Sequence, residues 1–288
     1  MIYLKEFRLL SDYDEYMILR GYEQRKIFNS MYPLHIFPTM NIEDLHFKEI
    51  TIFYGGNGSG KSTLLNIIAS KLNATRLSPI DKGSYFEHYV NLCKFDMSMD
   101  EPLEIKAITS DDVFDYLLDV RSINANVNRR KEKLSAEYLS NKFSSKDTSL
   151  DNYAKLKDIT ESKSQTMSKY VRERLTNNNI VEQSNGESAL LFWEKEIKED
   201  AIYILDEPEN SLSAENQLKL KKFIEESVRF YNCQFIISTH SPFLLALNEA
   251  KIYDLDSNLD KVKHWTELPN VRLYYDFFKE HDSEFKEK

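Results

Sequence analysis

The sequence predicts an α/β protein with a mostly parallel sheet flanked by helices. Two short apolar runs, Ala201–Leu205 and Phe235–Ser238, are typical of buried strands, and Leu212–Val228 between them has the apolar spacing of a helix. Nearer the N-terminus, Ile50–Tyr54 is a third such strand, followed by a glycine cluster and the helix Ser62–Leu72. Strands that alternate with helices favour a parallel sheet whose ligands bind at the carboxyl ends of its strands.

Further elements extend this pattern towards both ends of the chain. Ile2–Leu10 partly alternates polar and apolar residues, as a half-buried strand does, and Lys251–Leu255 is another short strand. Tyr32–Pro38 contains two prolines and is expected to be extended. The tail, Tyr274–Lys288, is predicted to be a charged helix with phenylalanines on its apolar side.

The middle of the chain differs in composition. Glycine is absent between Gly83 and Gly186, and lysine, glutamate, serine and asparagine dominate there. Val113–Leu118 and Arg129–Leu139 are expected to be helices of a solvated insertion, without the sustained heptads of a long coiled coil. We therefore expect residues 1–86 and 186–288 to form the two halves of the core and residues 87–185 to form a helical lobe.

Composition excludes several classes of protein. The 288 residues include 38 Lys and Arg against 47 Asp and Glu, for a net charge of −9, so nucleic acid would have to meet a local basic patch. Cys93 and Cys233 lie far apart, which excludes a disulfide framework and a structural zinc site. The chain has neither the apolar core of a signal peptide nor the roughly 20 apolar residues that span a bilayer. We expect a cytoplasmic protein.

The glycine cluster carries the strongest chemical signal. Residues 55–62 read Gly-Gly-Asn-Gly-Ser-Gly-Lys-Ser and fit the phosphate-binding pattern G-x-x-x-x-G-K-[ST] at every required position. Its glycines let backbone N–H groups surround phosphate oxygens, and the start of the following helix adds a positive dipole end. Lys61 is expected to reach the β- and γ-phosphates, and the Ser62 hydroxyl to bind Mg²⁺. The predicted phosphate-binding residues are Gly55, Asn57, Gly58, Ser59, Gly60, Lys61, Ser62 and Thr63.

Two carboxylates and a histidine follow the buried strands. Asp206 is predicted to join the Mg²⁺ shell through water, and Glu207 to be the base that polarises the attacking water. Neighbouring carboxylates on a strand point to opposite faces, but at a strand end, where the chain turns, both can approach one ion. His240 follows the next buried strand and is placed to bond the γ-phosphate and orient the water. The alternative for the two carboxylates is a polar strand end without a catalytic role, and the alternative for His240 is a surface or helix-capping histidine.

A further anion site is predicted before the helix Ser188–Lys198. Ser184-Asn185-Gly186-Glu187 offers a serine hydroxyl and free backbone N–H groups at a helix start. Taken alone, this segment would be read as a helix cap.

In this order, the four elements resemble those of the ATP-binding cassette ATPases. Residues 55–62 look like the Walker A motif, Ser184–Glu187 like a degenerate signature motif, and Ile202–Glu207 like Walker B with its catalytic glutamate. Ser211–Ser213 is similar to the D-loop, and His240 matches the switch histidine. Within that superfamily, the strings LDEPENSLS and STHSPFLL look most like small soluble bacterial AAA-family ATPases of the SMC-like and DNA-repair branch.

The resemblance implies an ATPase head with an antiparallel N-terminal β portion and a helical lobe that leads to the signature motif. It also implies that two protomers hold two ATP molecules head to tail, so that Ser184 and Gly186 of one chain contact the phosphate held by the other. We therefore expect catalysis by Glu207, His240 and Lys61, metal binding by Ser62 and Asp206, an ATP-dependent homodimer, and a separate effector protein.

Some positions depart from the family pattern. Gln183, Asn185 and Glu187 replace the usual leucine and the Gly-Gly-Gln of the signature motif. No glutamine lies between Lys61 and Gln165, so the usual ligand of the Q-loop is missing. The candidates to replace it are Glu87 and His88, and the candidates to stack on adenine are Tyr22 and Tyr32.

The biological role is open at this level. The leading hypothesis is a dimerisation switch in DNA maintenance or phage defence. The alternatives are the nucleotide-binding subunit of an ABC transporter and an ATP-sensing scaffold with little turnover. DNA could meet the basic clusters Arg129–Lys131 and Lys219–Lys222, although a solvated helix face is the simpler interpretation of both.

Overall fold

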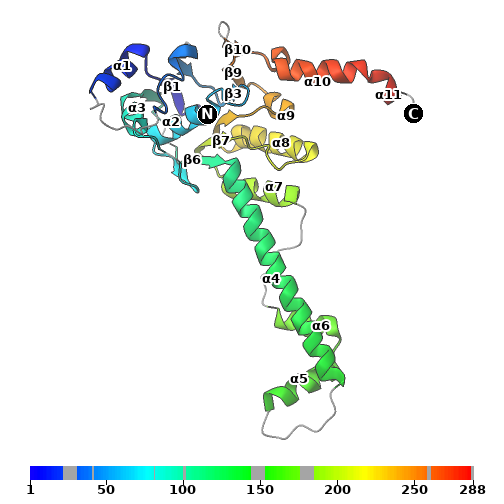
Figure 1. Ribbon diagram of the computed structural model, residues 1–288. Helices are drawn as coiled ribbons and strands as arrows, with labels where there is room; N and C mark the ends of the chain where they lie inside the picture. The colour runs from blue at the N-terminus through cyan, green and yellow to red at the C-terminus, as the bar shows by residue number, and fades with distance from the viewer. Residues whose placement is uncertain are drawn as a thin grey trace. The chain divides into compact units, whose positions relative to one another are not determined.

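The computed structural model describes residues 1–21, 31–40, 42–80, 82–99, 102–143, 153–175, 185–257 and 261–286 (Figure 1). The chain divides into two compact units. The first contains Met1–Phe114 and Ala189–Lys288, and the second contains Asp115–Ser188. The three-part division at residues 86 and 185 stays a prediction beside this two-unit description.

The first unit is built on a seven-stranded sheet. Its order is β10-β9-β3-β8-β7-β6-β4, and every neighbouring pair is parallel except β10 with β9. This confirms the mostly parallel sheet. The strands are β3 (Ile50–Tyr54), β4 (Thr75–Arg76), β6 (Glu104–Thr109), β7 (Ala201–Asp206), β8 (Gln234–Ser238), β9 (Lys251–Asp254) and β10 (Val262–Lys263).

The register of the central strands brings the predicted site residues to one edge. Asp206, the last residue of β7, pairs with Ser238, the last residue of β8. Phe53 of β3 also pairs with Ser238, so the glycine-rich loop begins at the same level. All residues of β3 and β8 are buried, which explains why both strands read as continuous apolar runs.

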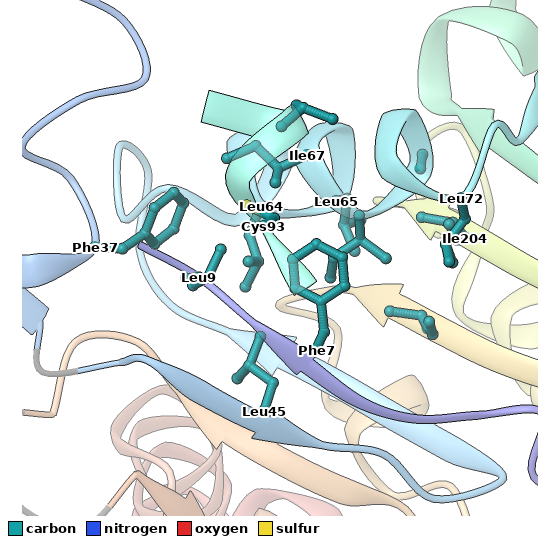
Figure 2. Close-up of a cluster of buried hydrophobic side chains, with 14 of the residues drawn as sticks. Phe7, Leu9, Phe37, Leu45, Leu64, Leu65, Ile67, Leu72, Cys93 and Ile204 are labelled. Atoms are coloured by element: carbon teal, nitrogen blue, oxygen red, sulfur yellow. The ribbon is translucent and has the colours of Figure 1, made fainter. Parts of the chain in front are cut away.

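A second, antiparallel sheet packs over helix α2 (Lys61–Lys71). Its order is β2-β1-β5, with β1 (Leu4–Arg8), β2 (Asp44–His46) and β5 (Lys94–Met97). Figure 2 shows Phe7 and Leu45 of this sheet facing Leu64 and Leu65 of α2 in one hydrophobic cluster. The predicted antiparallel N-terminal β portion is therefore present. Burial of α2 between two layers fixes the start of this helix, where the glycine-rich loop ends.

The remaining helices of the first unit include the predicted ones near Leu212–Val228 and Tyr274–Lys288, together with several that the sequence analysis did not predict. They are α1 (Asp12–Gly21), α3 (Phe86–Leu92), α8 (Ala214–Phe230), α9 (Pro242–Leu245), α10 (Pro269–Glu280) and α11 (Asp282–Lys286), with short 3₁₀ helices η1 (Pro38–Met40) and η2 (Trp265–Glu267). Helix α7 (Asn185–Glu196) begins three residues before the predicted helix. Helix α10 begins at a proline. Proline suits the first position of a helix because an N–H there would have no acceptor within the helix.

Two predictions about secondary structure were wrong. Tyr32–Pro38 is a series of turns rather than an extended segment. Turning there buries Leu34 and Phe37, and the His35 N–H donates to the buried carboxylate of Glu15 at 2.7 Å. The strands β5 and β6 lie in the stretch expected to be helical. They were missed because both are short and only Ala107 and Ile108 are fully buried.

The second unit is helical. Val113–Leu118 and Arg129–Leu139 belong to one helix, α4 (Ser110–Phe143), whose 34 residues contain neither glycine nor proline. It is followed by α5 (Tyr153–Ser164) and α6 (Met167–Arg174). Tyr138 and Tyr170 pack together with ring centroids 5.4 Å apart, and the Arg174 guanidinium lies 3.7 Å from the centre of the Tyr170 ring. Both tyrosines are buried, as is Ile159 of α5.

Candidate nucleotide-binding site

The loop between β3 and α2 has a backbone that only glycine adopts without strain. Gly58 and Gly60 have φ values of +84° and +83°. A Cβ at Gly60 would lie 3.1 Å from Ile36 Cγ2, and one at Gly55 would lie 2.4 Å from Ser59 Oγ. No side chain caps the start of α2. Its first N–H groups are therefore available to an anionic ligand.

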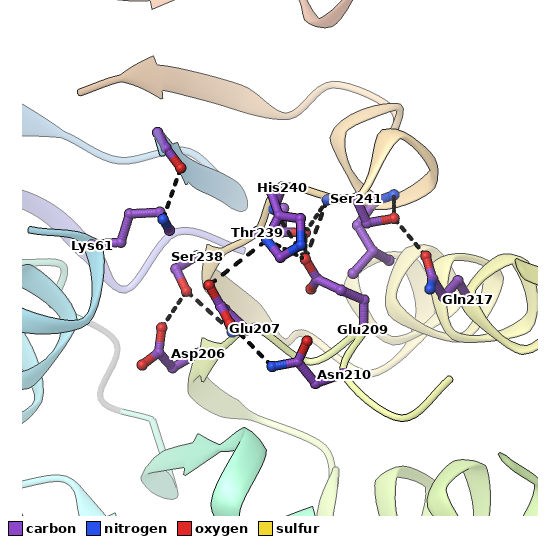
Figure 3. Close-up of polar contacts among 12 residues, drawn as sticks. Lys61, Asp206, Glu207, Glu209, Asn210, Gln217, Ser238, Thr239, His240 and Ser241 are labelled. Atoms are coloured by element: carbon purple, nitrogen blue, oxygen red, sulfur yellow. Dashed lines mark hydrogen bonds and ion pairs between the residues drawn. The ribbon is translucent and has the colours of Figure 1, made fainter. Parts of the chain in front are cut away.

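Lys61 folds back over this loop. Its side chain is 5% exposed, and Nζ donates to the carbonyl oxygens of Gly55 at 2.7 Å and Gly56 at 2.9 Å. Figure 3 shows one hydrogen bond from Lys61 to a main-chain carbonyl. Ser59 Oγ is buried without a hydrogen-bond partner among the described residues. A buried ammonium, an unpaired hydroxyl and uncapped N–H groups at one loop fit a phosphate group in charge and in hydrogen-bonding capacity.

Asp256 is hydrogen-bonded to the same loop. Its Oδ2 accepts a hydrogen bond of 2.7 Å from the Gly56 N–H. The aspartate follows β9, the parallel neighbour of β3, so it reaches the loop from the adjacent strand end. Sequence analysis missed this residue because nothing in its local pattern distinguishes it from an ordinary polar residue after a strand.

Asp206 and Glu207 are both connected to Ser238 across the strand ends. The Ser238 hydroxyl donates to Asp206 Oδ1, and the Glu207 N–H donates to the main-chain and side-chain oxygens of Ser238, each at 3.1 Å. Glu207 has a φ of +49°, so the chain turns directly after the strand. The turn breaks the strand alternation that would otherwise send these two neighbouring side chains to opposite faces of the sheet.

The protonation of Asp206 reflects its position. Burial raises the pKa of this carboxyl above its ordinary value. Hydrogen bonds from Ser238 and Ser62 lower the pKa, the negative charge of Glu207 raises it, and the positive charge of Lys61 lowers it. Asp206 and Ser62 are thus in contact, as two ligands of one metal ion would be.

His240 lies beside Glu207 at the same edge. Its Nδ1 is 3.7 Å from Glu207 Oε1 and 3.5 Å from Glu209 Oε1. The side chain is 47% exposed, and Glu207 Oε2 accepts a hydrogen bond of 3.1 Å from Asn210 Nδ2. The structure therefore places Lys61, Ser62, Asp206, Glu207 and His240 at one edge of the sheet.

Glu209 is a site residue that sequence analysis missed. It is only 5% exposed, and its Oε1 accepts hydrogen bonds from Thr239 Oγ1 at 2.6 Å, His240 N at 3.0 Å and Ser241 N at 3.2 Å (Figure 3). A third acidic residue directly after Asp206-Glu207-Pro208 was the available signal. It was overlooked because acidic residues in loops are usually exposed.

Several predicted residues fall elsewhere. Ser184, Gln183 and Tyr22 lie outside the described residues. Gly186 lies in the first turn of α7. Glu87 and His88 are exposed on α3, and Glu87 pairs with Lys82 at 3.5 Å.

A cavity of about 620 Å³ adjoins Asp206. Its lining includes Tyr32, Asn66, Ser84 and Ser110, but neither of the two exposed residues proposed to replace the Q-loop glutamine. Tyr32 stacks on Phe86 with parallel rings 5.9 Å apart.

The two basic clusters have different surroundings. Arg129–Lys131 is exposed on α4. Lys219, Lys221 and Lys222 each pair with a glutamate four residues away on α8, at 2.8, 3.0 and 3.7 Å. These pairs neutralise the second cluster, which favours a solvated helix face there.

The candidate metal site would need phosphate and water oxygens to complete the coordination of the ion. Within the described ranges, no group of three or more His, Cys, Asp or Glu side chains is arranged to hold a metal ion. Mg²⁺ is commonly bound through one or two protein oxygens together with phosphate oxygens and water. Ser62 and Asp206 fit that pattern.

Comparison with known families decides the identity of this site. The family model described as "ABC transporter" matches residues 42–210, more than half of the chain. The chain belongs to the ABC transporter family. The match contains the glycine-rich loop and the strand end with Asp206 and Glu207, and the protein is an ABC-type ATPase. A second family model, "AAA ATPase domain", matches residues 186–245, which include His240.

Individual relatives of this ABC-type ATPase are distant. A stretch of 78 residues is 37% identical to the small ribosomal subunit biogenesis GTPase RsgA of Pediococcus pentosaceus, and it spans 25% of each chain. A nucleotide-free ATP-binding cassette from an ABC transporter has a TM-score of 0.40 and 14% identity, covering 96% of this chain and 99% of that one. The SMC head domain from Thermotoga maritima has a TM-score of 0.37 and 14% identity, covering 91% and 99%. Membership of the SMC-like branch stays a prediction.

Proposed function

We propose that this ABC-type ATPase hydrolyses Mg-ATP at a head-to-tail homodimer interface and uses the cycle as a conformational switch on a separate partner protein. One observation carries the proposal. Glu207 and His240, the residues best placed to act on the attacking water, are 26% and 47% exposed at the sheet edge. Phosphoryl transfer is favoured where bulk water is excluded, and a second protomer over this edge would exclude it.

Within one protomer, the roles follow from the contacts. The N–H groups at the start of α2 and the Lys61 ammonium would hold the phosphates, with Ser59 and Thr63 beside them. Ser62 and Asp206 would bind Mg²⁺, which supplies positive charge against the phosphate oxygens when bound. Glu207 would accept a proton from the attacking water, and His240 would orient that water.

The second protomer would complete each site. Ser184 and Gly186 are proposed to contact the phosphate held by the other chain, where the helix start of α7 adds its positive dipole end. ATP would then stabilise the dimer and hydrolysis would release it, because the contacts differ between the two states.

The choice of partner rests on the family resemblance and on the charges of the basic clusters. Among the described residues, no helix is long and apolar enough to cross a membrane. Of the two basic clusters, Arg129–Lys131 is the better candidate for a DNA contact, since the lysines on α8 are already paired with glutamates. We therefore propose a protein effector and treat DNA as a question for experiment.

Light-scattering mass in the presence and absence of Mg-ATP tests the switch. The Glu207→Gln variant should shift from the 33.9 kDa of one chain to about twice that mass when ATP is added, because it binds ATP and hydrolyses it slowly. Ser184→Arg in the same background should abolish the shift, and Lys61→Ala should abolish nucleotide binding.

The other outcomes distinguish the alternatives. A mass that does not respond to ATP would rule out the switch. Equal turnover and equal dimer lifetime in wild type and Glu207→Gln would favour the ATP-sensing scaffold. Mobility shifts of duplex DNA that disappear when Arg129–Lys131 is neutralised would add a DNA partner.

A further inference from the structure

We infer that Glu209 is a positioning residue that fixes His240 for catalysis, an inference that rests on the proposed function. The carboxylate of Glu209 belongs to the loop after β7, whereas its hydrogen-bond donors are consecutive residues of the loop after β8. Its Oε1 accepts from Thr239 Oγ1, His240 N and Ser241 N at 2.6, 3.0 and 3.2 Å. The glutamate thus binds main-chain N–H groups on both sides of the histidine Cα.

The burial of Glu209 indicates that these hydrogen bonds are strong. The side chain is 5% exposed, and its Oε2 is buried without a hydrogen-bond partner among the described residues. A carboxylate withdrawn from water is unfavourable unless its charge is matched by donors. Here the donors are a hydroxyl and two N–H groups, and hydrogen bonds to an ionised acceptor are stronger than neutral ones.

The His240 side chain itself is not held by a hydrogen bond to either neighbouring carboxylate. Its Nδ1 lies 3.5 Å from Glu209 Oε1 and 3.7 Å from Glu207 Oε1, beyond good hydrogen-bonding distance. Both carboxylates face Nδ1, so Nε2, on the opposite side of the ring, is the nitrogen left for a ligand. The position of the ring therefore depends on its backbone, and the backbone depends on Glu209.

The same short segment also carries the proposed base. The Glu207 N–H bonds Ser238, and the Glu209 carboxylate bonds the three residues that follow Ser238. One set of loop contacts therefore fixes the position of Glu207 relative to His240. A loss of Glu209 would move the histidine relative to the base while leaving the phosphate loop intact.

A double-mutant cycle on steady-state hydrolysis of Mg-ATP tests this inference. Glu209→Ala should lower kcat by about 10- to 100-fold with little change in KM, because a small misplacement of a catalytic group has effects of this size. His240→Ala should lower kcat as well. In the His240→Ala background, Glu209→Ala should have almost no further effect, since its role is exerted through the histidine.

Conservative variants separate positioning from folding. Glu209→Gln keeps an acceptor oxygen for all three donors and should retain kcat within about threefold. Thr239→Val removes only the 2.6 Å hydrogen bond and should be intermediate. Glu226→Ala, which removes a half-exposed carboxylate of α8, is the matched control and should leave kcat unchanged. Thermal unfolding of each variant shows whether the fold is kept.

The possible results are distinct. Multiplicative effects of Glu209→Ala and His240→Ala would overturn the inference, as would a Glu209→Gln variant as impaired as Glu209→Ala while still folded. If Glu209→Ala does not fold, Glu209→Gln and Thr239→Val carry the same cycle. A wild-type protein without turnover, or with turnover insensitive to Lys61→Ala, would instead overturn the proposed function.

Discussion

The hydroxyl of Ser238 donates a hydrogen bond to the carboxylate of Asp206, across the ends of two neighbouring parallel strands. The bond is one of the interactions that lower the pKa of Asp206 against the effect of burial. It also aligns the carboxylate beside Ser62, the other proposed metal ligand. Ser238 therefore affects both the charge and the orientation of the proposed Mg²⁺ ligand.

Replacing Ser238 with alanine should weaken magnesium-dependent hydrolysis, most strongly at low pH. Loss of a hydrogen bond to the ionised form raises the pKa of Asp206 further, so protons compete better with the metal. The acid limb of kcat/KM against pH should move to higher pH, and the Mg²⁺ concentration for half-maximal rate should rise. Ser227→Ala, which removes another buried serine hydroxyl, is the control. An unchanged pH profile in Ser238→Ala would contradict this prediction.

Asp206→Asn should abolish hydrolysis without lowering stability at neutral pH. Burial raises the pKa of Asp206 in the folded state above 3.8, so the folded protein binds this proton more tightly than the unfolded chain does. The contribution of this group to stability is therefore present at low pH and is lost as pH rises through the raised pKa. The Asp206→Asn variant has a neutral side chain and does not lose this stability as pH rises.

Thermal unfolding without metal, measured between pH 4 and pH 8, checks this prediction. The Tm of Asp206→Asn minus that of wild type should increase across the window in which Asp206 ionises and then become constant. A variant that is less stable at pH 8 than at pH 4, relative to wild type, would show that the carboxylate stabilises the fold.

Much of this site could be predicted because its residues stand where buried strands end. Ile50–Tyr54, Ala201–Leu205 and Phe235–Ser238 are apolar runs of strand length, and the polar residue after each one had to lie at a shared edge once the sheet was parallel. The spacing of these runs therefore predicts that Lys61 and Glu207 lie close together.

The rest depended on contacts that no local pattern encodes. Glu209 and Asp256 act through hydrogen bonds to loops that are distant in sequence, over separations of 30 to 32 residues for Glu209 and 200 for Asp256. The turns at Tyr32–Pro38 arise because burial of Leu34 and Phe37 outweighs the extended preference before proline. Such features follow from tertiary packing, and sequence periodicity does not report on it.

Gly60→Ala should disrupt the phosphate loop far more than Gly56→Ala. At Gly60 a Cβ would require a φ of +83° and would lie 3.1 Å from Ile36, whereas at Gly56 the nearest atom is Asp256 Oδ2 at 3.6 Å. The left-handed backbone alone costs about 1–2 kcal/mol for a residue with a Cβ. We expect Gly60→Ala to lower both the free energy of unfolding and nucleotide affinity, measured by denaturant titration and by a fluorescent ATP analogue. Equal behaviour of the two variants would be inconsistent with the loop geometry.

Asp256→Ala should raise the KM for ATP while leaving kcat nearly unchanged. Asp256 is not among the residues proposed to act in the chemical step. It contacts the loop through the 2.7 Å hydrogen bond from the Gly56 N–H. A hydrogen bond to a charged acceptor contributes about 1.5–3 kcal/mol. Because the side chain is exposed, we expect the low end, a rise in KM of about tenfold. Asp256→Asn keeps an acceptor oxygen and should recover most of the affinity. A fall in kcat at unchanged KM would instead place Asp256 in the chemical step, which its contact with the Gly56 main-chain N–H argues against.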